Sequence, residues 1–299
     1  MNFSDDLKKA RAHLSDGSLK TYNSLLKSIY KNCWSDSIKE PNIKNFDKVK
    51  DVMKFLEDKS PSSRKTYLAS LVCLTDNNEY KKMMSDDMQT YKDEVNKQEL
   101  NEKQKASDIS VVEIKQVLDD LKKHSDLIYK KDKLNMNDIQ QIMDYVLLCL
   151  VSPIYNQPRR ALDYVLMKFR GDIDESKDNQ LDMKKNKLIF NVYKTSKFHH
   201  QQTLNVSPAL KRILSKWIKI IPANIDTLLF NGKGEALSAI TLNQRMVKIF
   251  KDRKISVNQM RHSFMSDKYS DLIKVEKEMS NDLNAMGSSI AQSKIYVKL

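Results

Sequence analysis

Residues 186–206 read NKLIFNVYKTSKFHHQQTLNV, and this stretch decides the fold class of the chain. Apolar and polar residues alternate in two short runs, at 188–192 and at 203–206, on either side of a polar centre. Alternation with a period of two is typical of half-buried strands, and a polar turn between two such runs indicates a β-hairpin. We therefore predict a small β-sheet in this part of the chain.

The stretches on both sides of residues 186–206 have a helical pattern. Their apolar residues recur at three- and four-residue steps, which places them on one face of a helix. Predicted helices cover residues 110–124, 136–152, 158–169, 209–221 and 238–252, and the helical pattern returns at 257–270 and beyond. The fold class that follows is mainly α with a small β-sheet.

The N-terminal third of the chain has the helical pattern without a strand pattern. Predicted helices cover residues 18–32, 46–58 and 62–74. A bundle of four or five short helices accounts for this region most simply. Residues 91–108 are polar and charged with few aliphatic side chains, which is typical of a linker or an exposed helix. We predict a helical domain over residues 1–105 and a second domain over residues 106–299.

The chain is strongly basic. Its net charge of +13 and its pI of about 9.3 predict a polyanionic partner such as nucleic acid. Lysine supplies most of the charge, as the codon bias of an AT-rich genome also would, so the nine arginines are more informative. A guanidinium that binds phosphate through two hydrogen bonds cannot be replaced by lysine without loss. Four of the nine are Arg159, Arg160, Arg170 and Arg261.

Several protein classes are excluded by what the sequence lacks. It has no apolar run of membrane-spanning length, and its N-terminus lacks the apolar core of a secretion signal. Cys33, Cys73 and Cys149 are widely spaced and odd in number, which indicates free thiols in a reducing compartment. No residues have the spacing of a metal site. We therefore predict an intracellular protein with no membrane partner, no metal and no cofactor.

Four local strings contain the residue types that phosphodiester transfer needs. In chain order they are PRRALD at 158–163, YKTSK at 193–197, NQMRHSF at 258–264 and MGSSIAQSKIY at 286–296. Transfer of a DNA phosphate without a metal requires a nucleophile, cations on the phosphate oxygens and an acid for the leaving oxygen. Two arginines, one lysine and one tyrosine can supply this set.

The order R…K…R…Y and these strings resemble the catalytic domain of tyrosine recombinases, the integrase family. In that family the first arginine begins an R-x-x-E/D pattern, which Arg160 and Asp163 match; Arg159 is the alternative. The family lysine lies in a β-hairpin just before a threonine, which Lys194 matches; Lys197 is the alternative.

The last two strings complete the resemblance. Arg261 lies in a string similar to the family's H-x-L-R-H-S/T-F, and Tyr296 follows Gly287 by nine residues, as the family tyrosine follows a Gly-His or Gly-Trp pair. Two positions depart from the pattern. Asn258 stands where the family has histidine or lysine, and Ser288 where it has histidine or tryptophan. Asparagine can still donate a hydrogen bond to phosphate but cannot carry a proton at neutral pH.

The resemblance implies a role for each matched residue. Arg160 and Arg261 would bind the scissile phosphate, with Asn258 and Ser288 in the remaining family positions. Tyr296 would attack the phosphorus and form a 3′-phosphotyrosine, and Lys194 would protonate the departing 5′-oxygen. The covalent link conserves the energy of the broken bond, so the implied reaction uses neither ATP nor a metal.

The resemblance also implies an architecture and a partner. The N-terminal helices resemble the SAM-like core-binding domain, which together with the α+β catalytic domain would form a C-shaped clamp on double-stranded DNA. Family members act as tetramers on two DNA sites. The AT-rich coding signature suggests a virus or mobile element, hence the cytoplasm of a prokaryotic host or the nucleus or viral factory of a eukaryotic one.

Two alternatives use the same fold. The departures at Asn258 and Ser288 also fit a non-catalytic DNA-binding regulator or a decayed integrase. A type IB topoisomerase would use the same tyrosine chemistry to relax supercoils without joining two sites. Formation of a protein–DNA adduct separates the first alternative from an enzyme, and the joining of two DNA sites separates the second.

Overall fold

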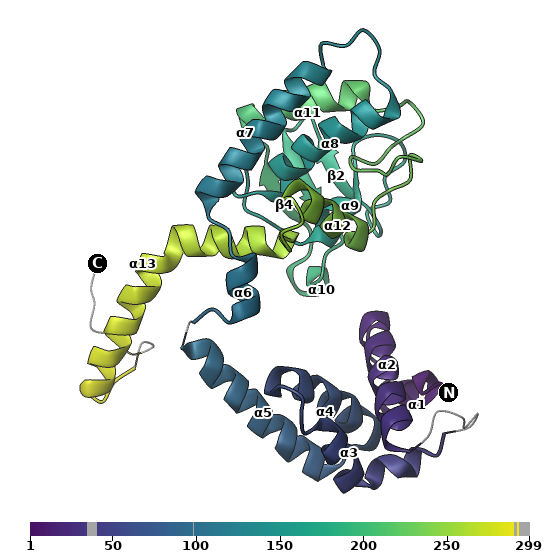
Figure 1. Cartoon of the computed structure of the whole chain (residues 1–299), viewed down its shortest axis with the longest axis vertical. Helices are drawn as coiled ribbons and strands as arrows, with labels where there is room; N and C mark the ends of the chain where they lie inside the picture. Colours follow the sequence, from purple (N-terminus) through teal and green to yellow (C-terminus); the bar gives the residue numbers. More distant parts are fainter. Residues whose placement is uncertain (35–40, 98, 290–291, 293–299) are drawn as a thin grey trace. The chain divides into compact units, whose positions relative to one another are not determined.

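The computed structural model describes residues 1–34, 41–97, 99–289 and 292. The chain forms two compact units, Met1–Leu100 and Asn101–Leu299, each with its own hydrophobic core (Figure 1). The predicted fold class, mainly α with one small sheet, is confirmed. The two units are described separately below.

Unit 1 is entirely helical in its described residues. Its elements are α1 (Ser4–Ala10), α2 (Asp16–Cys33), the 3-10 helix η1 (Ile43–Asp47), α3 (Val49–Leu56), α4 (Pro61–Thr75) and α5 (Asn78–Asn96). Ser60 caps the first turn of α4, and Pro61 takes the first helical position, where its missing N–H costs nothing. Aromatic rings fill the core, and the Tyr80 hydroxyl donates a 2.6 Å hydrogen bond to the Phe46 carbonyl. The predicted helical bundle is confirmed.

The helices of unit 2 surround one central helix. They are α6 (Glu102–Ser107), α7 (Val111–Ile128), α8 (Met136–Val151), α9 (Ala161–Val165), α10 (Ser196–His199), α11 (Pro208–Ile220), α12 (Ala239–Ile249) and α13 (Val257–Ala285). Every residue of α8 from Tyr145 to Val151 is buried. A helix that is apolar on all sides needs neighbours on all sides, and α8 packs against α7, α9, α11 and α12.

The sheet of unit 2 has four short strands in the order β1-β2-β3-β4. They are β1 (Met167–Lys168), β2 (Asn179–Asp182), β3 (Lys187–Phe190) and β4 (Gln202–Asn205). The first pair is parallel and the other two pairs are antiparallel. The predicted hairpin is confirmed as β3 and β4, with Ile189 opposite Thr203.

The predicted helix at residues 158–169 is wrong in its second half. Helix α9 ends at Val165, and the chain continues directly into strand β1. The Met167 carbonyl accepts a hydrogen bond from Leu228 N, and Leu166 O accepts one from Asn179 N. These long-range hydrogen bonds take the place of the helical ones, so tertiary pairing overrides the local helical periodicity.

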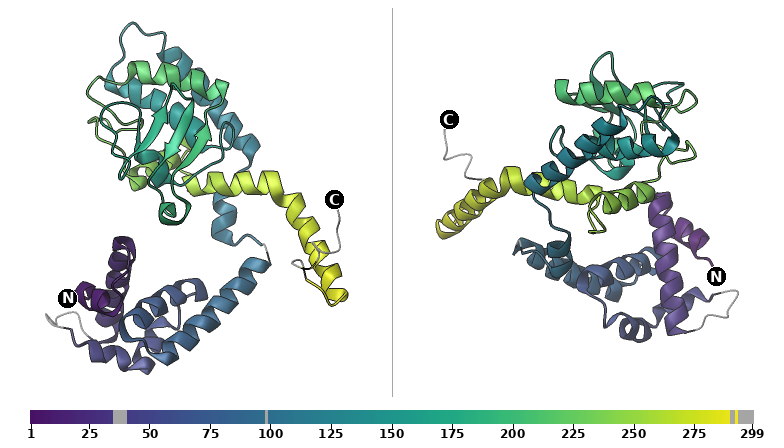
Figure 2. Two further views of the ribbon diagram at one scale, coloured as in Figure 1. Left: turned by 180° about the vertical axis from the view of Figure 1, so that it is seen from behind. Right: turned by 45° about the horizontal axis from the view of Figure 1, so that its top comes forward.

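Helix α13 has 29 residues and continues beyond residue 270, as the sequence pattern predicts (Figure 2). Its first two turns bury Val257, Met260 and Ser263 against the core of unit 2. The Ser263 hydroxyl donates to the Ile109 carbonyl at 2.5 Å, which ties this end of α13 to the start of α7. The position of residues 257–263 is therefore well defined within the unit.

No helix in the described ranges has the length and apolar character needed to cross a membrane.

Candidate functional site

A small pocket in unit 2 is lined by arginines from distant parts of the sequence. It has a volume of about 150 Å³. Its lining residues are Pro158, Arg159, Arg160, Asp163, Tyr193, Thr195, Gln202 and Arg261. Three of the nine arginines in the chain therefore lie around one small cavity. We call this cavity the arginine pocket.

Three structural elements build the arginine pocket. Arg160 is the N-cap residue of α9, in an extended conformation with φ −78° and ψ 155°. Tyr193 and Thr195 come from the connection between β3 and β4, and Gln202 is the first residue of β4. Arg261 lies on the second turn of α13. The pocket forms where the start of α9, the hairpin and α13 meet.

Arg159 is held in the interior of the site. Its Nε donates to Asp163 Oδ2 at 2.8 Å, and its Nη1 donates to Gln202 Oε1 at 2.8 Å. Its guanidinium carbon also lies 4.1 Å from the ring centre of Phe190 and 4.8 Å from that of Tyr193. With 15% of its side chain exposed, Arg159 joins α9 to the β-hairpin as a structural residue.

Arg160 is exposed and differs from its neighbour. In the described part of the chain its side chain makes no ion pair, because Asp163 pairs with Arg159 instead. Of the two arginines that the sequence left as alternatives, Arg160 is thus the one whose guanidinium is available to an external anion. The R-x-x-D spacing matched Arg160 with Asp163, but the bonded pair is Arg159 with Asp163, four positions apart.

Asp163 is buried beneath the pocket, with 1% of its surface exposed. Burial raises the pKa of this carboxyl, and the adjacent Arg159 guanidinium opposes the rise. Its second oxygen, Oδ1, is buried and has no hydrogen-bond partner among the described residues. Asp163 thus forms its ion pair with Arg159, while the charge of Arg160 acts on it without an ion pair.

Arg261 is oriented by Asn258. The Nη1 of Arg261 donates to Asn258 Oδ1 at 3.2 Å, and Asn258 Nδ2 lies 3.1 Å from His262 Nε2. Because a guanidinium only donates, the Asn258 oxygen must face Arg261 and its amide nitrogen must face His262. His262 Nε2 is then the acceptor of this contact. This network makes Asn258 a positioning residue for Arg261.

Lys194 lies in the hairpin connection, as the motif predicts, between the pocket residues Tyr193 and Thr195. Its side chain is exposed and does not line the arginine pocket. The alternative, Lys197, is exposed on α10. Lys194 is the closer of the two to the pocket along the chain.

Of the two C-terminal candidates, Ser288 and Tyr296, the structure describes only Ser288. Ser288 follows α13, and its hydroxyl donates a 3.1 Å hydrogen bond to Gln292 Oε1. It does not line the arginine pocket. Tyr296 lies outside the described residues.

Sequence reasoning missed Tyr193, Thr195 and Gln202 as pocket residues. The first two flank Lys194 in the string YKTSK, so the motif itself was the available signal. Gln202 carried no signal of its own. Its position beside Arg159 depends on the β3–β4 register, in which it pairs with Phe190.

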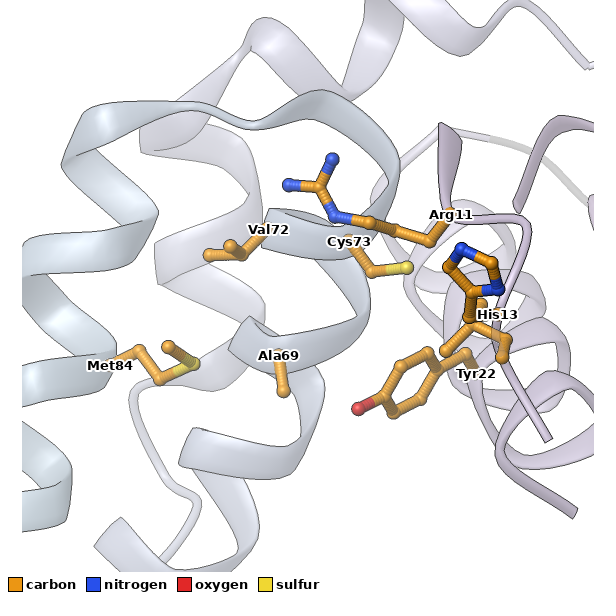
Figure 3. Close-up of a pocket in the computed structure, with 8 residues that line it drawn as sticks. Arg11, His13, Tyr22, Ala69, Val72, Cys73 and Met84 are labelled. Atoms are coloured by element: carbon orange, nitrogen blue, oxygen red, sulfur yellow. The ribbon is translucent and has the colours of Figure 1, made fainter. Parts of the chain in front are cut away.

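A second pocket, in unit 1, has a different character (Figure 3). Its volume is about 440 Å³, and Ala69, Val72 and Met84 give it apolar walls opposite Tyr22. Its one arginine, Arg11, forms a 2.7 Å ion pair with Asp76. The only arginine among the described residues that line this cavity is thus paired within unit 1. No group of three or more metal-binding side chains occurs among the residues that the structure describes.

No family model and no curated protein matches the sequence. Among solved structures, the chain is similar to XerA recombinase at 10% identity, with 89% of this chain and 83% of that chain covered and a TM-score of 0.38. A lambda integrase dimer bound to a COC′ core site matches at 12% identity, over 91% of this chain and 71% of that one, with a TM-score of 0.47.

XerH site-specific recombinase bound to a palindromic difH substrate matches at 17% identity, over 89% of this chain and 72% of that one, with a TM-score of 0.48. The names of these structures agree with the family resemblance of the sequence motifs.

Proposed function

We propose that this protein is a DNA strand-transferase that cleaves and rejoins DNA through a 3′-phosphotyrosine on Tyr296. The main support is the arginine pocket, where Arg160 and Arg261 meet with no carboxylate partner for either among the described residues. Two planar guanidiniums with free donors suit a tetrahedral phosphate with two non-bridging oxygens. A net charge of +13 favours DNA as the source of that phosphate.

The proposed reaction proceeds in two balanced steps. The Tyr296 oxygen attacks the phosphorus and loses its proton, the bond between phosphorus and the 5′-oxygen breaks, and Lys194 delivers a proton to that oxygen. The 5′-hydroxyl of a second strand then attacks the phosphotyrosine and gives its proton to the neutral Lys194, and the tyrosine leaves and takes back from solvent the proton that it released there in the first step. Arg160 and Arg261 stabilise the charge that develops on the phosphate oxygens in both steps.

Asn258 and Arg159 act through other residues in this proposal. Asn258 holds Arg261 at the pocket, and Arg159 fixes the start of α9 against the hairpin that carries Lys194. Residues 1–105 would bind DNA as a core-binding domain, with residues 106–299 as the catalytic domain. Four copies on two DNA sites, in a virus or mobile element, complete the proposal.

The test is adduct formation on nicked duplexes that represent the DNA flanking the gene of this protein. A nick close to the cleaved phosphate releases a short fragment and traps the covalent intermediate. We expect a denaturation-resistant adduct in excess chelator, located on Tyr296 by peptide mass, and its disappearance in Tyr296→Phe. An adduct on another residue, or one that requires a divalent metal, contradicts the proposed chemistry.

A second function, a non-catalytic DNA-binding protein, is favoured by the two departures from the family pattern. Asn258 cannot carry a proton, and Ser288 does not line the pocket in the described structure. Specific DNA binding by the wild-type chain with no adduct on any nicked duplex would support this regulator. Relaxation of supercoiled DNA without joining of two sites would instead support a topoisomerase.

A further inference from the structure

The connection between β3 and β4, residues 191–201, displays an exposed phenylalanine. We call this segment the finger. Phe198 has 81% of its surface exposed, more than any other large hydrophobic residue in the described structure. Phenylalanine is ordinarily among the residues most often buried. An exposed phenylalanine ring within a polar segment therefore indicates a binding partner that covers the ring.

The finger is held in a defined conformation. The Tyr193 hydroxyl donates to the His200 carbonyl at 2.7 Å, and Gln201 Nε2 donates to Asn191 Oδ1 at 2.7 Å. These two bonds cross the base of the finger from one side to the other. At the tip, the backbone N–H of Phe198 donates to the Thr195 carbonyl at 3.0 Å. Phe198 is thus presented by an ordered turn.

The charge around the finger points to a polyanion. No aspartate or glutamate occurs between Asp182 and Asp226. The basic residues of that interval are Lys184, Lys185, Lys187, Lys194, Lys197, Lys211, Arg212, Lys216 and Lys219. Within the finger, Lys194 and Lys197 flank the exposed ring along with two histidines. Nucleic acid presents phosphates, which bind cations, and bases, which stack on aromatic rings. An exposed ring among cations, with no acid nearby in sequence, therefore indicates a nucleic-acid partner.

The finger begins and ends at the arginine pocket. Tyr193, Thr195 and Gln202 line that pocket, and Phe198 is three residues beyond Thr195 on the short helix α10. Three helical residues span about 4.5 Å, and successive base pairs of DNA are separated by about 3.4 Å. A phosphate bound in the pocket would therefore place Phe198 within about one to three base steps of it.

We propose that Phe198 inserts between bases of the DNA next to the phosphate held in the arginine pocket, while Lys197 binds a neighbouring phosphate. This inference rests on the proposed function, because it requires DNA in the pocket. Apolar side chains that enter a base step unstack it and kink the duplex. Opening the duplex beside the cleaved phosphate frees the strand end that must move to a new partner.

The experiment combines two measurements on the full-length chain. First, 2-aminopurine is placed at successive positions around the cleaved phosphate, where unstacking increases its fluorescence. We expect an increase at one step with the wild-type chain and none with Phe198→Ala. Ile240→Ala is the matched control, because Ile240 is a large apolar residue on α12 with 72% exposure and should leave the signal unchanged.

Second, the rate of adduct formation is compared on paired duplexes and on duplexes with a mismatch at the same step. Phe198→Ala should be slower by about tenfold or more on the paired duplex, and the mismatch should restore most of the rate. Phe198→Trp should retain the wild-type rate, since a larger ring still stacks. Equal defects of Phe198→Ala on paired and mismatched DNA would overturn the inference, because a wedge acts only by opening the step.

The outcomes separate this inference from the proposed function. A fluorescence increase that depends on Phe198, without any adduct, supports the wedge and contradicts the transferase. Adducts formed equally by the wild-type chain and by Phe198→Ala, with no fluorescence change, contradict the wedge alone. A Phe198→Ala variant that loses self-association and keeps the fluorescence signal would assign the ring to a contact with a second copy of the chain.

Discussion

Unit 2 uses arginine in two different environments. At the junction of α8 and α12, Arg245 donates through Nε to Asp144, through Nη1 to Gln140 Oε1 at 2.6 Å, and through Nη2 to the Gln140 carbonyl. All three guanidinium nitrogens thus have acceptors. At the arginine pocket, Arg160 and Arg261 have no carboxylate partner in the described part of the chain.

The difference shows how to distinguish structural arginines from functional ones. A guanidinium that is surrounded by acceptors from its own chain joins secondary structure elements and has little left to offer a ligand. Arg160 and Arg261 instead line one cavity whose only lining acid among the described residues, Asp163, is paired with Arg159. That arrangement is understandable if an anion later occupies the space between them. The predictions below test this distinction.

The largest effect is expected for Arg160→Ala and Arg261→Ala. Each should reduce the rate of adduct formation by about 10²–10³, since each removes a donor from the developing phosphate charge. Thermal unfolding should be unchanged, because neither side chain forms an ion pair among the described residues. The measurements are single-turnover cleavage and thermal denaturation. A large loss of stability with normal cleavage would reverse the assignment of the two environments.

Arg245→Ala should behave in the opposite way. It leaves Asp144 and Gln140 without their partner inside unit 2, which should lower the free energy of unfolding by about 1–3 kcal/mol. Denaturant titration measures this change. Arg212→Ala, at an exposed position on α11, serves as the control and should stay within about 0.5 kcal/mol of the wild type. Equal free energies of unfolding for Arg245→Ala and Arg212→Ala would show that the Arg245 hydrogen bonds do not stabilise the junction of α8 and α12.

Asn258→Ala should have an intermediate effect on activity. Loss of its hydrogen bond frees Arg261 to adopt other rotamers, and one such bond corresponds to a rate change of about two- to tenfold. The Arg261→Ala background provides the control: there, Asn258→Ala should add almost nothing, because a positioning residue acts only through its target. Additive losses in the double variant would indicate that Asn258 contacts the phosphate itself.

The smallest effect concerns the carboxylate of Glu113. Glu113 accepts hydrogen bonds from the backbone N–H and hydroxyl of Ser110 and from Arg253, and these hold the pKa of its carboxyl below the ordinary value. A carboxyl group whose pKa is lower in the folded state than in the unfolded state stabilises the fold at pH values above the unfolded-state pKa. This stabilisation is lost as the pH falls through the folded-state pKa.

Glu113→Gln should therefore lower the free energy of unfolding at pH 7 by about 0.2–1 kcal/mol, the range of exposed pairs. The glutamine keeps the capping geometry, so the difference from the wild type should vanish in acid below pH 4.5. Denaturant titrations at several pH values test this. A difference that persists in acid would mean that the charge is not its cause.

The sequence by itself determined the fold class, the hairpin at β3 and β4, and the strings that contain Arg160, Lys194 and Arg261. These features are local, because periodicity and spacing depend only on residues near one another in the chain. The predicted helix at 158–169 failed for the complementary reason. Hydrogen bonds from residues 179 and 228 decided the structure of its second half.

Only the tertiary structure decided which arginine binds its own chain and which is available to a ligand. Arg159 and Arg160 are adjacent and chemically identical, and the local R-x-x-D spacing paired Asp163 with Arg160, whereas the fold pairs it with Arg159. The β3–β4 register placed Gln202 beside Arg159, and packing of α13 on α7 brought Arg261 to the pocket. Whether a donor finds an acceptor depends on which distant groups the fold places next to it, and that information exists only in three dimensions.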